Sequence, residues 1–125
     1  MKIATIILRI LMGALFIFAS VSYFLDLVPQ PEVGGDMKVF NDGLAASGYL
    51  MPLVKAIELI CGIAFVLGRF VPLATVVIFP VVVNIVSVHV FLAPEGLPVA
   101  LFVLAVNLLL AYRNKAVYQP LFKSK

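Results

Sequence analysis

The sequence predicts an all-α integral membrane protein, a bundle of four transmembrane helices with both termini in the cytoplasm. Its composition is the first indication, because 64% of the 125 residues are hydrophobic and only 12% are charged. Globular domains carry about 25% charged residues. The second indication is four long apolar stretches, at about residues 3–27, 52–67, 70–92 and 97–112. A bilayer core about 30 Å thick needs roughly 20 apolar residues per helix, so stretches of this size are suited to crossing it.

Basic residues indicate which way the helices run. If the chain crosses the membrane four times, only Lys38 and Lys55 lie toward the outer side, among acidic residues. Cytoplasmic loops carry the excess of Lys and Arg, so the other, basic side is assigned to the cytoplasm. These cations flank helices and form no continuous basic face, which argues against nucleic acid as a partner. The basic side comprises Lys2, Arg69, Arg113, Lys115, Lys123 and Lys125.

The first apolar stretch shares some features with a cleaved signal peptide, including Lys2 and small residues near Ala19 and Ser20. Arg9 interrupts its apolar run, however. The run is also about ten residues longer than the apolar core of a signal peptide. We therefore expect this stretch to be retained as a transmembrane helix.

The segment between the first and second stretches, residues 28–51, is expected to lie outside the membrane. Pro29 and Pro31 end the preceding helix, because proline cannot continue one. Within the loop, residues 37–46 are predicted to form a short helix at the outer surface. Its apolar side chains share one face and are Met37, Phe40 and Leu44.

Prolines also mark the other helices. Pro52 suits the first turn of the second helix, where its missing N–H needs no acceptor. That helix is short and contains Lys55 and Glu58, so we expect it to be surrounded by protein rather than lipid. Pro80 lies near the middle of the third helix and is expected to kink it, freeing a carbonyl one turn earlier. Residues 94–98 form the outer turn into the fourth helix.

Each predicted helix has one face of small or polar residues. Small residues let helices approach closely and polar residues avoid lipid, so these faces are expected to meet in a polar bundle interior. At about 1.5 Å of rise per residue, Glu58, Asn84 and Asn107 fall near the membrane centre. We expect a polar cluster that opens toward the outer leaflet, with Glu58 at its floor. The four faces are Arg9, Gly13, Phe16, Ser20 and Tyr23; Lys55, Glu58, Gly62 and Arg69; Pro80, Asn84 and Ser87; and Ala100, Asn107 and Ala111.

Glu58 is the leading candidate for function. A carboxylate near the membrane centre costs roughly 2.5–3.5 kcal/mol to insert, so it requires a functional or structural reason. The structural alternative is an ion pair with Lys55, one turn away, or with Arg9 of the first helix. We expect Lys55 to extend outward to the interface and Arg9 to have a structural role.

Three other polar side chains are candidates. His89 points about 140° away from Asn84 on an ideal helix, so the two share no face. Its ring is expected to face another helix, the outer interface or a ligand head group. Asn84 and Asn107 are expected to hydrogen-bond between helices, for example to the carbonyl freed by Pro80. With one Cys61 and one His89, the sequence indicates no disulfide, no pair of haem ligands and no metal-ligand cluster.

An ordered set of residues runs through the chain: Arg9, Gly13 and Phe16; Glu58, Leu59 and Gly62; Gly68, Arg69, Phe70 and Pro72; then Pro80, Asn84 and residues 89–91. This set resembles the DoxX/DoxD-like small membrane proteins, over about residues 3–122 and as one domain of residues 1–125. The resemblance implies a four-helix, multi-pass protein of the bacterial cytoplasmic (inner) membrane. Some members are associated with redox systems, including the small subunit of thiosulfate:quinone oxidoreductase, and others act in assembly. Many members have a Lys or His late in the first helix, where this chain has Tyr23 and Phe24.

The resemblance and the polar residues together suggest two functions. The first is an accessory protein, catalytic or not, of a redox or quinone-linked system, binding a quinone-like ligand in the outward-facing pocket through Glu58, Tyr23 and His89. The second is a structural or assembly subunit of a larger membrane complex, whose polar residues fasten helices together. A transporter is less favoured, because the chain has no repeat with matching broken helices. The expected partners are membrane lipid, other membrane subunits or a second copy of the chain, and the one cofactor considered is a quinone.

Overall fold

Every element that the structure describes is helical. In chain order these are α1 (Ile3–Leu25), α2 (Gly35–Ala46), α3 (Leu50–Leu67), α4 (Val71–Phe91), the 3-10 turn η1 (Pro94–Gly96), α5 (Leu97–Arg113), α6 (Lys115–Tyr118) and the 3-10 turn η2 (Gln119–Phe122). The structure is a computed structural model that describes residues 2–27 and 34–124. Four segments are long and apolar enough to cross a membrane: α1, α3, α4 and Pro94–Arg113, which joins η1 to α5. The predicted fold class, an all-α membrane protein with four spans, is therefore confirmed.

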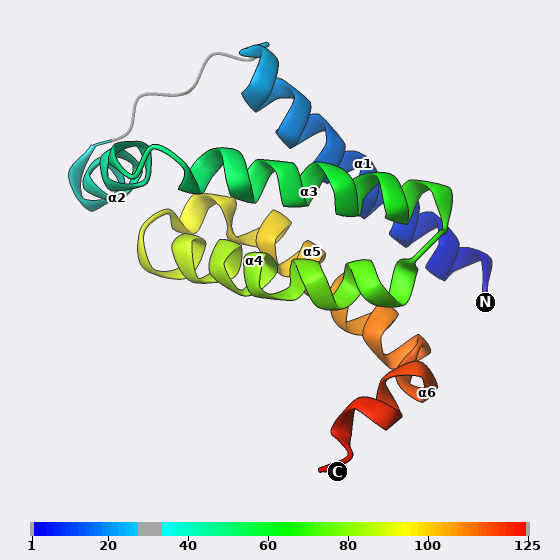
Figure 1. Cartoon of the computed structure of the whole chain (residues 1–125). Coiled ribbons are helices and arrows are strands. Elements are labelled where there is room, and N and C mark those ends of the chain that lie inside the picture. Colours follow the sequence, from blue (N-terminus) through cyan, green and yellow to red (C-terminus); the bar gives the residue numbers. More distant parts are fainter. Residues whose placement is uncertain (1, 28–33, 125) are drawn as a thin grey trace.

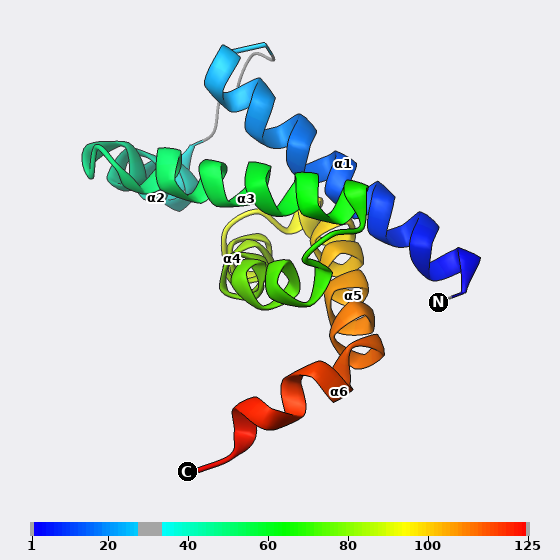
Figure 2. The same cartoon turned by 45° about the vertical axis from the view of Figure 1, so that its right-hand side comes forward.

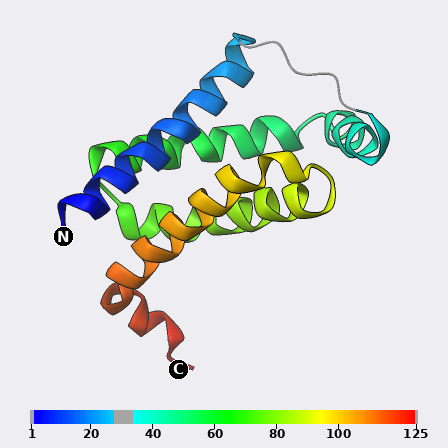
Figure 3. The same cartoon turned by 180° about the vertical axis from the view of Figure 1, so that it is seen from behind.

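The four membrane helices form a ring in which each packs against its two neighbours. α1 packs most extensively against α3, and α4 against α5, while contacts of α3 with α4 and of α1 with α5 close the ring. α1 crosses α3 obliquely, as the front and back views show (Figure 1, Figure 3). The N-terminus and α6 lie at the end of the bundle opposite α2 (Figure 1). Lys2, Arg69 and Arg113 thus lie at one end, which we call the basic end.

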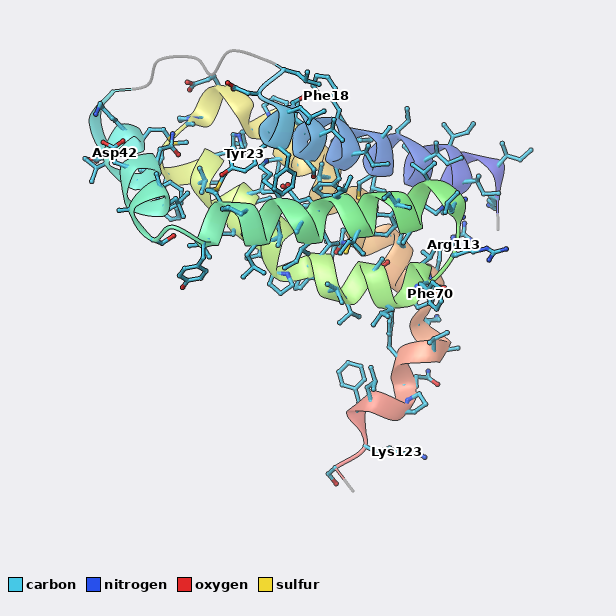
Figure 4. All side chains as sticks on the ribbon, turned by 45° about the horizontal axis from the view of Figure 1, so that its top comes forward. Phe18, Tyr23, Asp42, Phe70, Arg113 and Lys123 are labelled. Carbon is cyan, nitrogen blue, oxygen red and sulfur yellow. The ribbon has the colours of Figure 1, made fainter. Side chains whose placement is uncertain are left out.

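The core of the bundle is apolar and receives a large side chain from each membrane helix. Its largest fully buried apolar side chains, all 0% exposed, are Met12, Phe65, Ile78, Val82 and Leu110. The outer surface is also apolar, and exposed aromatic rings such as Phe18 and Phe70 project from it (Figure 4). Because membrane-spanning helices carry this surface, lipid covers it.

Two glycines allow the close crossing of α1 and α3. A Cβ atom added at Gly13 would lie 2.7 Å from the Gly62 carbonyl oxygen, and one added at Gly62 would lie 2.9 Å from the Gly13 carbonyl oxygen. Each glycine therefore faces the backbone of the other helix, a contact that no larger residue permits. The predicted packing role of these two positions is confirmed.

The predicted surface helix is present as α2, two residues longer at its N-terminus than expected. Its half-buried side chains are Met37, Phe40 and Leu44, the apolar face predicted from the sequence. On the exposed side, the Lys38 ammonium and the Asp42 carboxylate form an ion pair of 3.0 Å. α2 contacts α3 and turns away from the bundle (Figure 1).

Two helix boundaries differ from the prediction. α1 ends at Leu25, because Asp26 adopts a left-handed conformation with φ of 54°. α3 begins at Leu50 rather than Pro52, since the Ser47 hydroxyl oxygen accepts a hydrogen bond of 3.1 Å from the Leu50 N–H and caps the helix earlier. Pro29 and Pro31, which were expected to end the first helix, lie outside the described residues.

Candidate functional site

A buried ion pair lies halfway along α3. Glu58 is 4% exposed, and the Lys55 side chain, one turn closer to the α2 end, is 19% exposed. The Lys55 ammonium lies 3.1 Å from Glu58 Oε2. Oε2 nevertheless accepts no well-directed hydrogen bond from the described residues. Glu58 thus has one close cation, and its Oε2 is buried beside that cation.

This pairing decides between the alternatives that the sequence left open. The partner of Glu58 is Lys55, not Arg9, and Lys55 does not extend outward as expected. A buried carboxylate without a counter-ion is strongly destabilising, so the position of Lys55 one turn away favours the pair over extension of the lysine to the interface. Glu58 also lies one helical turn from Gly62, on the face that meets α1 at the close crossing. The carboxylate is thus surrounded by protein near the middle of a membrane-spanning helix.

Arg9 caps the other end of α3. Its Nε–H donates a 2.8 Å hydrogen bond to the Phe65 carbonyl oxygen. The guanidinium group lies against Gly68, where a Cβ atom would come within 2.9 Å of Arg9 Nη2. Gly68 itself has φ of 73°, a conformation suited to glycine, and ends the helix. A cation at the carbonyl end of a helix is stabilised by the helix dipole, so these contacts agree with a structural role for Arg9.

His89 lies near the α2 end of the bundle and contacts the turn before α5. Its Nδ1 is 2.7 Å from the Ile85 carbonyl oxygen, so Nδ1 carries a proton and donates it. The ring occupies the space beside Gly96, where an added Cβ atom would collide with it. The ring therefore faces η1 at the α2 end of the bundle. The contacts described for His89 do not include Glu58.

The two polar residues late in α1 have separate surroundings. Ser20 is fully buried, and its hydroxyl donates a 2.6 Å hydrogen bond to the Phe16 carbonyl oxygen of the same helix. Tyr23 is half-buried and meets the Phe24 ring edge to face, with centroids 5.4 Å apart. Figure 4 shows Tyr23 on the side of α1 that faces α3, and Phe18 on the other side. Of the residues expected in one outer cluster, the described contacts join only Lys55 and Glu58.

The prediction that Pro80, Asn84 and Ser87 form the inward face of α4 is wrong. Asn84 and Pro80 are exposed, and the Ser87 hydroxyl donates to the Val83 carbonyl oxygen of its own helix at 2.9 Å. The buried face consists instead of Val71, Ala74, Thr75, Ile78 and Val82. α4 is apolar on all sides, so small and β-branched side chains that fit between α3 and α5 decided which face turned inward.

Asn107 in α5 makes the interhelical hydrogen bond that was expected of it. The residue is 0% exposed, and its Nδ2 donates to the Thr75 carbonyl oxygen of α4 at 3.4 Å. Pro80 frees the carbonyl of Val76. The acceptor for Asn107 is instead the carbonyl of Thr75, one residue earlier. Oδ1 has no hydrogen-bond partner among the described residues.

A cavity beside Asn107, at the basic end, was not predicted from the sequence. It has a volume of about 340 Å³ and lies between α4, α5 and the C-terminal segment of α6 and η2. The Tyr118 hydroxyl donates a 2.7 Å hydrogen bond to the Pro72 carbonyl oxygen, which holds that segment against α4. Burial raises the pKa of the Tyr118 phenol, so the phenol is neutral at physiological pH. A lone Asn in an apolar helix was the available signal for this site.

A second cavity, of about 330 Å³, lies between α1 and α5. Its lining is apolar and is formed by Leu11, Ala14, Leu15, Phe18 and Phe102. Neither of these two cavities is lined by Glu58.

Comparisons with known proteins place the chain in a family. No curated protein matches it, and no solved structure does. The family model described as DoxX matches residues 4–90, a stretch that includes nearly all of α1 and α4, all of α2 and α3, the Glu58–Lys55 pair and the Arg9 cap. Because this match spans well over half of the 125 residues, the chain belongs to the DoxX family.

Proposed function

We propose that this DoxX protein is an accessory membrane subunit of a redox-linked system and binds a quinone-like ligand at Glu58. DoxX membrane proteins are often linked to redox or quinone-related systems in general. The observation that carries the proposal is the buried carboxylate midway along a membrane-spanning helix, paired with the Lys55 ammonium. Intramembrane carboxylates with a nearby cation are typical of proton-exchange and ligand sites.

The chemistry proposed for the pair is proton exchange. A quinone takes up two electrons and two protons as it is reduced. Glu58 in its neutral form delivers one of these protons, and Lys55 stabilises the carboxylate that remains. Water supplies the second proton and reprotonates Glu58. The electrons are assigned to a partner subunit, since the chain carries no recognisable electron carrier. The role of the chain is therefore to position the ligand and supply a proton, while the partner supplies the electrons.

Native mass spectrometry of the protein extracted with its own lipids tests this proposal. We expect a quinone to be retained by the wild-type protein and lost in Glu58→Gln, which keeps the shape and removes the exchangeable charge. Glu95→Gln is the matched control, because Glu95 is an exposed carboxylate in η1 outside the membrane helices. Retention of quinone by a folded Glu58→Gln variant would reject the proposal.

A specific observation also favours the second function, a structural subunit that docks against another membrane protein or a second copy. Asn84 is exposed near the middle of α4. An amide that faces lipid leaves its hydrogen-bonding groups unpaired, whereas a neighbouring transmembrane helix can pair them. This function predicts that Asn84→Leu lowers recovery of the complex in native gels while the bundle remains folded. Val83→Leu, at the exposed neighbouring position, should leave the complex intact.

A further inference from the structure

The cavity at the basic end combines an apolar lining with one buried polar group. Its lining includes the rings of Phe79, Tyr118 and Phe122, and none of the described residues that line it is charged. A volume of about 340 Å³ is in the range of small-molecule sites, which are mostly apolar with a few polar groups that orient the ligand. Its lining residues come from α4, α5 and the C-terminal segment of α6 and η2, which extends away from the end of α5 (Figure 2).

Each donor atom among the polar groups of this cavity has one acceptor in the protein. Asn107 Nδ2 donates to the Thr75 carbonyl oxygen, and the Thr75 hydroxyl donates to the Val71 carbonyl oxygen at 2.7 Å. The Tyr118 hydroxyl donates to the Pro72 carbonyl oxygen. The Thr75 carbonyl also determines the orientation of the amide, because a carbonyl pairs with Nδ2 and not with Oδ1. The polar atom of the lining that has no partner among the described residues is an acceptor, the buried Asn107 Oδ1.

We propose that this cavity is a ligand site, separate from Glu58, that binds an uncharged apolar molecule through a hydroxyl group donating to Asn107 Oδ1. An unpaired amide oxygen in an apolar site is costly, so a ligand that supplies a donor is favoured over one that supplies a second acceptor. The absence of a charged lining residue disfavours a charged head group. Both a hydroquinone and a lipid alcohol have the required chemistry. The oxidised quinone, which has only carbonyl acceptors, does not.

Equilibrium binding of tritiated tetramethylhydroquinone to the full chain in nanodiscs, under anaerobic reducing conditions, tests the proposal. Empty nanodiscs report the background from partition into lipid. We expect saturable binding that is weakened about fivefold in Asn107→Leu, the loss expected for one hydrogen bond. Asn41→Leu is the matched control, because it removes the same amide from an exposed position of α2. This control should bind as the wild-type protein does.

Two competitors identify the chemistry and source of the ligand. The dimethyl ether of the hydroquinone has the same ring but no donor, and we expect it to compete about fivefold less well. Competition by farnesol, a long-chain alcohol, is compared with competition by the unlabelled hydroquinone. Stronger competition than the unlabelled hydroquinone assigns the site to a lipid alcohol, and weaker competition assigns it to a hydroquinone.

A second variant keeps the test decisive if Asn107→Leu does not fold. Ala111 lines the cavity, so Ala111→Phe fills it without changing the amide. Loss of binding in a folded Ala111→Phe variant supports the site, and unchanged binding overturns it. The proposal is also overturned if binding does not exceed that of empty nanodiscs. Binding that depends on Glu58 but not on Asn107 would likewise overturn it, while leaving the proposed function intact.

Discussion

At the scale of single residues, surroundings rather than identity decide what each polar side chain does. Glu58 is conspicuous in the sequence because a carboxylate in an apolar helix requires a reason. The partner of Glu58 cannot be identified from the sequence, since Lys55 and Arg9 are both candidate cations. The partner of Glu58 depends on the end of α3. The Phe65 carbonyl oxygen there accepts a hydrogen bond from Arg9, and Lys55 is the cation that pairs with the carboxylate.

The Glu58–Lys55 pair leads to a prediction about stability. Lys55→Leu leaves a buried carboxylate without a counter-ion and should lower the free energy of unfolding by about 3 kcal/mol. Replacing both residues with Leu should restore most of that loss, because two apolar side chains leave no buried charge. Titration with denaturing detergent, followed by circular dichroism, measures both effects.

The exposed ion pair of α2 is the control for this prediction. Lys38 and Asp42 are also one turn apart but lie in solvent, so Lys38→Leu should change stability by at most about 0.5 kcal/mol. If Lys55→Leu were equally mild, the carboxylate would not depend on Lys55 for its stability.

At the scale of elements, the sequence predicts the helices more reliably than their inward faces. Length and apolarity identify α1, α3, α4 and α5, since only a helix satisfies its backbone groups in lipid. In α1 the alternation of small and large residues also identifies the buried face. α4 carries no such contrast, and the one Asn84 was mistaken for a mark of the interior. Lipid and protein interior are equally apolar, so hydrophobicity does not separate them.

The α1–α3 crossing leads to a prediction at this scale. Gly13→Ala places a Cβ atom 2.7 Å from the Gly62 carbonyl oxygen, a backbone atom that cannot move aside alone. The two helices must separate, and we expect the free energy of unfolding to fall by about 2 kcal/mol. Thermal unfolding in nanodiscs measures this change.

Gly43→Ala provides the comparison, because a Cβ atom at this position of α2 meets nothing within 4 Å. Alanine is the better helix former by about 1 kcal/mol, so this variant should be neutral or slightly more stable. An equal loss of stability in both variants would mean that the close crossing is not the cause.

At the scale of the whole molecule, the even number of spans places both chain ends at one end of the bundle, with α2 at the other (Figure 1). The excess of Lys and Arg at the basic end predicts that this end faces the cytoplasm. Labelling of single cysteines with a membrane-impermeant maleimide tests it. Cys61 is buried, so it contributes little background.

The labelling outcome is specific for each end. Asn41→Cys in α2 should react in intact cells, whereas Ser124→Cys near the C-terminus should react only after the membrane is permeabilised. Both positions are exposed in the structure, so a difference in reactivity reports their side of the membrane. The reverse pattern would show that the basic end faces outward.

The sequence by itself determined the fold class, the four spans, the surface helix with its apolar face, and Glu58 as the most unusual residue. These features follow from length, apolarity and helical spacing, which are local properties of the chain. Only the tertiary structure decided that Lys55 pairs with Glu58, that Arg9 caps α3, and that Asn84 faces outward. It also revealed the cavity at Asn107, which three segments of the chain enclose together. Such features depend on which surfaces meet, and in an apolar membrane protein close packing makes that choice.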